Sequence, residues 1–294
     1  MHHKFHLINN LCFFCFFLSG RNSQRSIKLI PTCLILFIIT LLTTLHAQEL
    51  HVPYVTTPPE VVNKMMEVGD VGPGDYVIDL GSGDGRILIE AARRGAIGHG
   101  VEIKPELVRE AEKNAQKAGV SDKVMFLQEN VFHSDFSRAT VITSYMTTTL
   151  QTRLRPSLLN DLNPGTRIVA HDFHMGAWKA DKHVAMGDHD VYLWIVPATI
   201  EGRWYWKIND KKFTMKASQK FQEIRLKVRA EDNSLKIEHS ELSGRNLNFT
   251  AVNPKNGNRY NFHGMVEGII IEGLVQIHHD EEKWIESWSA STIQ

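Results

Sequence analysis

The chain has 294 residues, of which 43% are apolar and 22% are charged, an ordinary composition for one large or two modest globular domains. Its 33 Lys and Arg residues balance 33 Asp and Glu residues, so it lacks the basic excess typical of nucleic-acid binders. We therefore expect no nucleic-acid partner. All 3 cysteines precede Ala47, so the chain from that residue onward can form no disulfide and offers no Cys nucleophile or Cys metal ligand.

The first 47 residues predict a signal peptide or an N-terminal membrane anchor. The basic residues Arg21, Arg25 and Lys28 precede an apolar run at 29–45, and Ala47 offers a cleavage site. The run is long for a signal peptide, so a retained anchor that associates with a membrane stays open. The basic flank favours a location of the rest of the chain outside the cytoplasm in either case, in a bacterial-type periplasm if the leader is cleaved. A start codon downstream of the first residue would instead leave it in the cytoplasm.

Strand and helix patterns alternate from residue 48 to residue 197, which predicts an α/β domain: a Rossmann-like doubly wound sheet with helices on both faces. A helix is expected to open with Pro58 in its first position, capped by Thr57 in a capping box with Glu60. The further predicted elements are strands at 76–80, 98–102, 124–127, 140–142, 167–170 and 192–196, and helices from 87 to about 95, at 105–119 and at 150–162.

The pattern of the sequence changes after residue 197. No long helical period remains, and short β-patterned runs alternate with turn residues such as Asn256-Gly257. Residues 198–294 therefore predict a small all-β accessory domain, either a barrel or a sandwich.

The segment from Val77 to Arg86, VIDLGSGDGR, carries the chemistry. It follows a β run and opens a helix, and its three glycines let the backbone turn sharply and approach a ligand. Asp79 stands before the glycines, and Glu102 ends the next strand about 20 residues beyond Gly81, where a carboxylate can accept ribose hydroxyls. An acid ahead of the glycines is poorly placed for a pyrophosphate but suits a ligand with an ammonium and a sulfonium. The pattern favours S-adenosylmethionine over a nicotinamide dinucleotide or a degenerate loop.

Three segments together resemble one group of class I, seven-strand methyltransferases. They are the loop GSGDGR, the residues YVTTP that start at Tyr54, and the residues GVEIKP that start at Gly100. The group comprises the protein-lysine methyltransferases related to the mitochondrial enzyme that modifies the ATP synthase c-subunit. The similarity covers roughly residues 52–178 and implies transfer of a methyl group to a lysine amine. The chain departs from that group by its β domain and its export signal.

The resemblance assigns the glycine loop to the methionine part of S-adenosylmethionine. The residues expected to hold this part are Asp79, Gly81, Ser82, Gly83 and Gly85.

The remaining cofactor contacts follow from the same resemblance. Glu102 would bind the ribose, Ile103 would pack on the adenine, and Asn130 would contact the adenine amino group. Tyr54 and Thr56 would close over the cofactor, with a plain N-terminal arm as the alternative.

The catalytic step is harder to locate from the sequence. The residues after the fourth predicted strand, TSYMT from Thr143, contain no Asn-Pro-Pro-Tyr motif, which disfavours adenine and glutamine as acceptors. Tyr145 is the candidate catalytic residue lining the acceptor site, with a core-edge aromatic as the alternative. The histidines around His171 and His189 are expected to be solvated or core residues rather than metal ligands, because Asp172 alone fits an acidic metal ligand.

We therefore predict a methyltransferase that acts on a protein lysine, with the β domain helping to recognise the substrate. Two alternatives stay open. The first is a small-molecule or lipid methyltransferase whose β domain forms an apolar pocket. The second is a non-catalytic binding protein on a methyltransferase scaffold, which export would favour because the methyl donor is a cytoplasmic metabolite.

Overall fold

The structure is a computed structural model that describes residues 55–292. The predicted leader at 1–47 and the candidate residue Tyr54 lie outside the described residues. No helix in the described part of the chain is long and apolar enough to cross a membrane.

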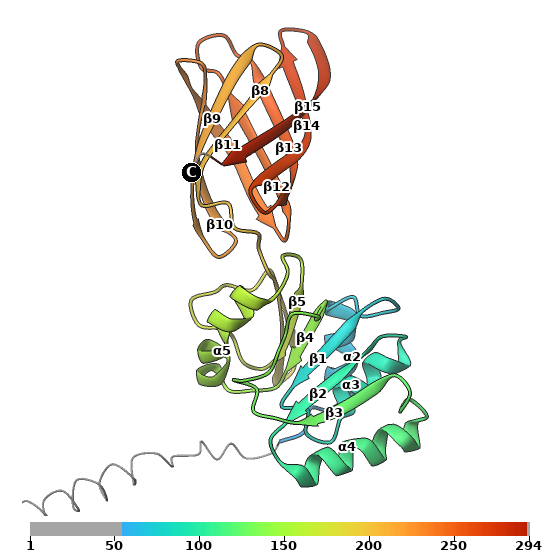
Figure 1. The fold of residues 1–294 in the computed structure, drawn as a ribbon. Helices are drawn as coiled ribbons and strands as arrows, with labels where there is room; N and C mark the ends of the chain where they lie inside the picture. The colour runs from blue at the N-terminus through green and yellow to red at the C-terminus, as the bar shows by residue number, and fades with distance from the viewer. Residues whose placement is uncertain (1–54, 293–294) are drawn as a thin grey trace, which may run out of the picture. The chain divides into compact units, whose positions relative to one another are not determined.

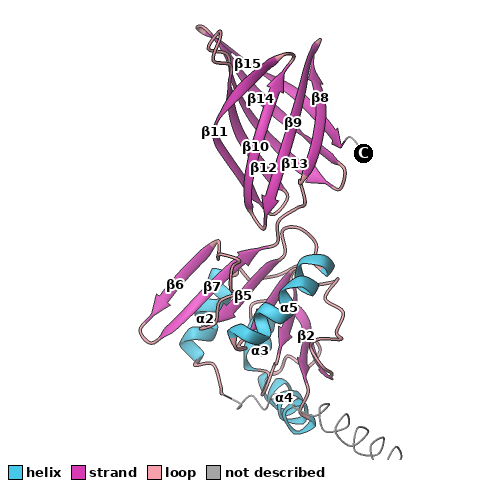
Figure 2. Ribbon diagram, turned by 90° about the vertical axis from the view of Figure 1, so that its left-hand side faces the viewer, coloured by secondary structure: helices cyan, strands magenta, loops and turns pink. Residues whose placement is uncertain are grey.

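The first part of the described chain is a seven-stranded sheet in the order β3-β2-β1-β4-β5-β7-β6; Figure 1 labels β1 to β5, and Figure 2 labels β6 and β7. Neighbouring strands are parallel from β3 to β5, and β7 runs antiparallel to both β5 and β6. The elements are α2 Pro59–Val68, β1 Tyr76–Leu80, α3 Arg86–Arg93, β2 Ile97–Glu102, α4 Pro105–Ala118, β3 Val124–Gln128, β4 Val141–Ser144, α5 Thr148–Asp161, β5 Arg167–His171, β6 Lys182–Met186 and β7 His189–Ile195.

Alternate residues of the central strands bury apolar side chains on opposite faces of this sheet. On β1, Val77 packs into a cluster with residues of α2, α3 and α4, whereas Ile78 packs into a second cluster with Leu154 and Leu158 of α5. Helices therefore cover both faces (Figure 2), as expected for parallel strands whose residues are buried on both sides. The predicted Rossmann-like fold class is confirmed.

The start of α2 differs from the prediction. Pro58 is the N-cap with an extended backbone, the helix begins at Pro59, and no side chain caps it. A residue that precedes a proline is sterically disfavoured in the helical region, which explains why Pro58 does not open the helix. The predicted Thr57–Glu60 capping box is therefore wrong, and the Thr57 hydroxyl contacts His171 instead.

The second part of the described chain is a closed barrel of eight antiparallel strands. Each strand pairs with its neighbours in sequence, and the last strand closes on the first through the pairs Ser291↔Tyr205 and Thr292↔Trp204. The strands are β8 Gly202–Ile208, β9 Lys211–Lys220, β10 Glu223–Ala230, β11 Asn233–Ser243, β12 Asn246–Val252, β13 Arg259–Glu267, β14 Ile270–His279 and β15 Glu282–Thr292.

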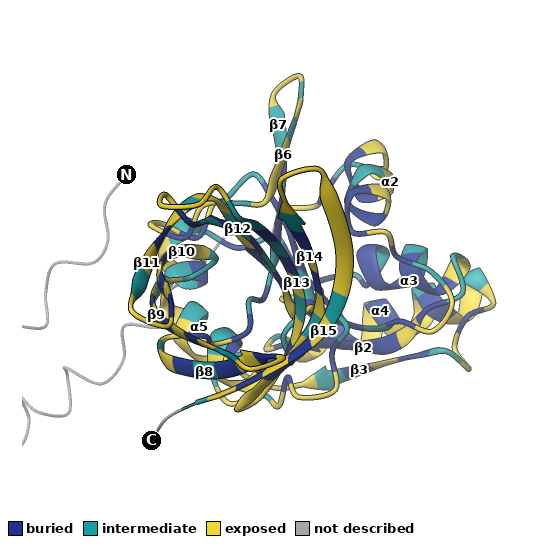
Figure 3. Ribbon diagram, turned by 90° about the horizontal axis from the view of Figure 1, so that it is seen from above, coloured by how far each residue is buried: buried dark blue, intermediate teal, exposed yellow. Residues whose placement is uncertain are grey.

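Large side chains fill the interior of the barrel. Buried and exposed residues alternate along most of its strands (Figure 3). Trp206 lies 5.4–6.5 Å, between ring centroids, from its buried aromatic neighbours, which are Phe213, Phe249, Phe262 and Trp288. The predicted all-β part is confirmed as a barrel, whereas the domain boundaries at residues 47 and 197 stay predictions. The aromatic packing argues against an apolar ligand pocket in this part.

Candidate active site

The glycine loop lies at the carboxyl end of β1, between this strand and α3. Its backbone is locked onto β2, because the amides of Gly81 and Ser82 donate to the carbonyl of Val101 at 2.9 and 3.0 Å. Gly85 has φ +82°, and a Cβ there would lie 2.7 Å from Cζ of Phe126. A side chain at this position would clash with Phe126 of β3, so glycine is what lets the loop lie this close to the sheet.

Asp79 is the buried acid of this site. The hydroxyl of Thr143 on β4 donates to its Oδ1 at 2.7 Å, while its Oδ2 is buried and has no hydrogen-bond partner among the described residues. Burial raises the pKa of Asp79 to about 7, against the smaller opposing effect of the Thr143 hydrogen bond. A buried carboxyl oxygen without a partner is costly, so the site is suited to a ligand that brings a cation or donor to it.

Glu102 ends β2 beside the loop and is only 7% exposed. Its Oε2 accepts the Gly83 amide at 3.0 Å and its Oε1 accepts the Lys104 amide at 2.9 Å. Each carboxylate oxygen can accept a further hydrogen bond, so both remain available to a pair of hydroxyls. The buried hydroxyl oxygen of Ser82 also has no partner among the described residues.

The other predicted cofactor residues lie along the same edge of the sheet. Ile103 is 57% exposed directly after β2. Asn130 follows β3, is exposed, and accepts the Phe132 amide on its Oδ1 at 3.0 Å. Thr56 is exposed ahead of α2, and the carbonyl of its neighbour Thr57 accepts a 2.9 Å hydrogen bond from Arg86 of α3.

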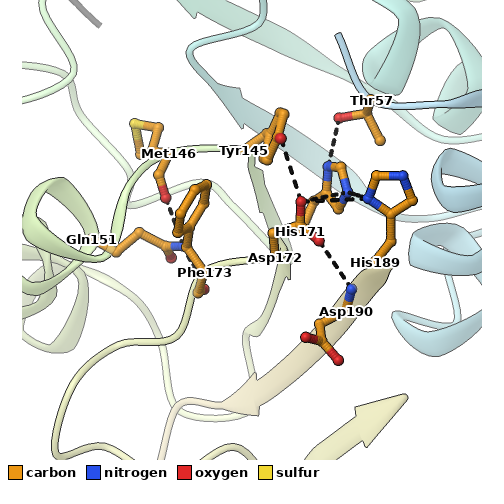
Figure 4. A network of polar contacts seen from close by, with 9 residues as sticks. All are labelled: Thr57, Tyr145, Met146, Gln151, His171, Asp172, Phe173, His189 and Asp190. Carbon is orange, nitrogen blue, oxygen red and sulfur yellow. Dashed lines mark hydrogen bonds and ion pairs between the residues drawn. The ribbon is translucent and has the colours of Figure 1, made fainter. Parts of the chain in front are cut away.

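A second polar cluster lies at the ends of β4 and β5 (Figure 4). The Tyr145 hydroxyl donates to Oδ2 of Asp172 at 3.3 Å, and the Tyr145 ring lies 4.0 Å from the ring of His171, between centroids. His171 is fully buried and contacts both Thr57 and His189. Burial lowers the pKa of His171 to about 4, so its imidazole is neutral at pH 7.

The two clusters are neighbours in the fold. A Cβ at Gly81 would lie 3.7 Å from Cγ of Met146, the residue that follows Tyr145. Gln151 of α5 holds the loops after β4 and β5 together by donating to the carbonyls of Met146 and Phe173 at 3.1 and 2.7 Å. The contacts of Thr57 and His189 in this cluster were not predicted from the sequence, and only the pairing of β7 with β5 could have revealed the second.

A buried acid before a glycine turn, a second acid at the end of the next strand and this strand order define a class I methyltransferase that uses S-adenosylmethionine. Residues 79–182 match the family described as the ANTKMT methyltransferase domain. A protein-lysine N-methyltransferase of Saccharolobus islandicus (strain REY15A) is 42% identical over 154 residues, which are 50% of this chain and 94% of the relative. The chain belongs to the protein-lysine N-methyltransferase family.

Further similar proteins include a vertebrate relative and a solved bacterial structure. A Xenopus laevis enzyme named as the lysine N-methyltransferase of the ATP synthase c-subunit is 29% identical over 144 residues, 49% of this chain and 62% of the relative. Among solved structures, an RNA methyltransferase from Salinibacter ruber in complex with S-adenosyl-L-homocysteine is 50% identical and covers 50% of this chain and 96% of its own, with a TM-score of 0.49. The family match and the Saccharolobus relative confirm the predicted enzyme class, family and cofactor.

Proposed function

We propose that this protein transfers a methyl group from S-adenosylmethionine to the side-chain amine of a lysine in a protein. The observation that carries the proposal is the buried Asp79 oxygen without a partner among the described residues, which suits a cationic ligand at the glycine loop. The choice of a protein lysine as the acceptor rests on the activity named for the Saccharolobus relative, which is matched over almost its whole length.

The residues present fit the cofactor. Asp79 would hold the ammonium group of its methionine part, together with the loop residues Gly81, Ser82, Gly83 and Gly85. Glu102 would accept the two ribose hydroxyls on oxygens that the backbone amides of Gly83 and Lys104 already orient. When bound, the cofactor supplies a methyl group on a positively charged sulfur.

Two further cofactor contacts belong to the proposal. The exposed side chain of Ile103 would pack on the adenine, and Asn130 would contact the adenine amino group through its side-chain or backbone oxygens. Thr56, on the segment that Arg86 ties to α3, would close over the cofactor, with Tyr54 before it.

Tyr145 is the residue we place on the acceptor side. Its ring stacks with that of Phe173 at a centroid distance of 5.8 Å. Aromatic faces suit the apolar stem of a lysine and the positive charge that its nitrogen acquires on methylation. The lysine ammonium must first lose its proton to solvent, so that the nitrogen lone pair can form the bond to the methyl carbon while the carbon–sulfur bond breaks. Holding the neutral amine in line and excluding water from the transfer are the contributions that we assign to these side chains.

A genetic comparison tests the acceptor. Proteome and lipid extracts from a deletion strain are compared by mass spectrometry with those from the strain complemented by the wild type, by Asp79→Asn or by Asp161→Asn, an exposed control. We expect a methyl-lysine to vanish on deletion and to return with the wild type and Asp161→Asn only. Loss of a methyl mark from a lipid alone would refute lysine as the acceptor. A calorimetric titration of the wild type that shows no binding of S-adenosylmethionine would refute the proposed enzymatic activity.

We also propose that the segment 1–47 carries the remainder of the chain out of the cytoplasm or holds it at a membrane. The support is its order of basic residues, apolar run and small residue. A reporter that is active only outside the cytoplasm, fused after residue 54, tests this. Activity is expected, and a silent reporter in a well-expressed fusion would refute export.

A further inference from the structure

We infer that His171, Asp172 and His189 form a binding site for a divalent transition-metal ion. Their three facing atoms are Nε2 of His171, Nδ1 of His189 and Oδ2 of Asp172. The two nitrogens are 3.0 Å apart, and the carboxylate oxygen lies 3.2 Å from Nε2 of His171 and 3.4 Å from Nδ1 of His189. Figure 4 shows the three side chains converging.

These separations match the edges of a coordination sphere. Ligands about 2.0–2.1 Å from a tetrahedral ion are about 3.3–3.4 Å apart, and those on one face of an octahedral ion are about 2.9 Å apart. A single point can therefore lie about 2.0–2.1 Å from all three atoms. Three protein ligands leave at least one coordination position open.

Second contacts orient two of the three ligands. The Thr57 hydroxyl lies 3.2 Å from Nδ1 of His171, so a proton on Nδ1 leaves Nε2 free as a ligand atom. The amide of Asp190 donates to Oδ1 of Asp172 at 3.0 Å, which turns Oδ2 toward the histidines. Partners of this kind fix the tautomer and direction of metal ligands.

The backbone is also arranged for this convergence. Asp172 has φ +59°, in the left-handed region that non-glycine residues rarely adopt. Its amide donates to the carbonyl of Asp190 at 2.7 Å, which holds the residue in this conformation. The residue with this backbone conformation is the one whose carboxylate lies beside both imidazoles.

The donor set selects the class of ion. Two imidazole nitrogens and one carboxylate oxygen suit Zn²⁺, Fe²⁺, Co²⁺ or Ni²⁺, whereas Mg²⁺ and Ca²⁺ prefer oxygen ligands. The competing arrangement is a hydrogen-bonded cluster in which one imidazole N–H points at the other two atoms. A measurement of metal binding distinguishes the metal site from the hydrogen-bonded cluster. Because this measurement does not use the methyl-transfer activity, its outcome does not depend on the proposed function.

The test uses the full chain, freed of metal with a chelator and titrated with Co²⁺, Zn²⁺ and Mg²⁺ by absorption spectroscopy and calorimetry. His189→Gln removes a half-buried ligand at the surface end of the cluster. His183→Gln is the matched control, because His183 lies in the same hairpin with its Nε2 2.6 Å from Oδ1 of Asp190. Segment 1–54 contains His and Cys residues of its own, but it is identical in every variant.

We expect His189→Gln to lose one equivalent of Zn²⁺ and the Co²⁺ visible absorption that belongs to it, while His183→Gln keeps both. Thr57→Val should weaken the same equivalent by about tenfold, as loss of an orienting partner does. Circular dichroism of each variant shows whether it is folded. Equal Zn²⁺ stoichiometry and affinity in the wild type and His189→Gln would overturn the inference. So would equal losses in His189→Gln and His183→Gln, or binding of Mg²⁺ in preference to Zn²⁺.

Discussion

Replacing Asp79 by Asn is expected to stabilise the ligand-free protein at neutral pH. Burial raises the pKa of this carboxyl from 3.8 to about 7. Each tenfold change in proton affinity is worth about 1.4 kcal/mol, so keeping the carboxylate buried at pH 8 costs about 4 kcal/mol. The Asn amide leaves an unpaired N–H, which costs about 1–3 kcal/mol. Asp79→Asn should therefore raise the free energy of unfolding by about 1–3 kcal/mol at pH 8.

The pH dependence follows from the direction of the pKa change. The folded chain binds a proton at Asp79 more tightly than the unfolded chain, so the wild type loses stability as the pH rises from about 4 to about 7. Asp79→Asn removes this loss. Urea denaturation of both proteins at pH 4.5 and pH 8 should therefore show the advantage of the variant at pH 8 and its disappearance at pH 4.5.

The same carboxyl makes cofactor affinity depend on pH. A cation beside Asp79 requires the ionised form, so affinity for S-adenosylmethionine should be about 30-fold lower at pH 5.5 than at pH 8, and Asp79→Asn should bind at least about tenfold more weakly at pH 8. The exposed variant Asp161→Asn is the control for both measurements. Asp79→Asn that is no more stable than the wild type at pH 8, or that binds the cofactor equally well, would refute the reasoning.

Glu102→Gln should weaken S-adenosylmethionine binding about 10- to 100-fold in calorimetry, because the Gln amide turns a donor toward one of the two backbone amides that Glu102 accepts. In urea denaturation, Gly85→Ala should cost at least about 1 kcal/mol more than Gly119→Ala, which shares a positive φ but meets nothing within 4 Å; equal costs would contradict the steric argument at Phe126. Trp206→Ala removes a large side chain from the barrel core and should lower the free energy of unfolding by about 3–5 kcal/mol. The affinity for S-adenosylmethionine should stay within about twofold, and a larger change in affinity would show that the two parts are coupled.

The grouping of Asp79, the glycine turn and Glu102 could be predicted because it depends on local sequence. The glycine turn, the acid of β1 and the acid of β2 lie within 24 residues of one another, and parallel pairing of β1 with β2 brings their ends together. The unpartnered oxygen of Asp79 could not be predicted, since its burial depends on packing from β4 and the loop.

The second cluster could not be predicted because its contacts are non-local. His189 reaches His171 only through the antiparallel register of β7 on β5, in which His171 pairs with Val191. The partner strand β6, Lys182–Met186, went unpredicted because its side chains are exposed or half-buried and carry no apolar alternation. Closure of the barrel likewise depends on pairing between its first and last strands, which a local pattern does not encode.

The antiparallel strand β7 carries His189 to the second cluster on a hairpin that the parallel strands do not share. The β6–β7 hairpin lies at one edge of the sheet, and among the described strands it pairs with the parallel strands only where β7 meets β5. A one-residue shift in the register of β7 on β5 would turn His189 to the other face of the sheet, away from His171, while the glycine loop, Asp79 and Glu102 would stay as they are. The candidate donor-binding residues, from Asp79 to Glu102, and the cluster of His171, Asp172 and His189 thus lie on separate stretches of chain, so exchange of the hairpin would vary the second without altering the first.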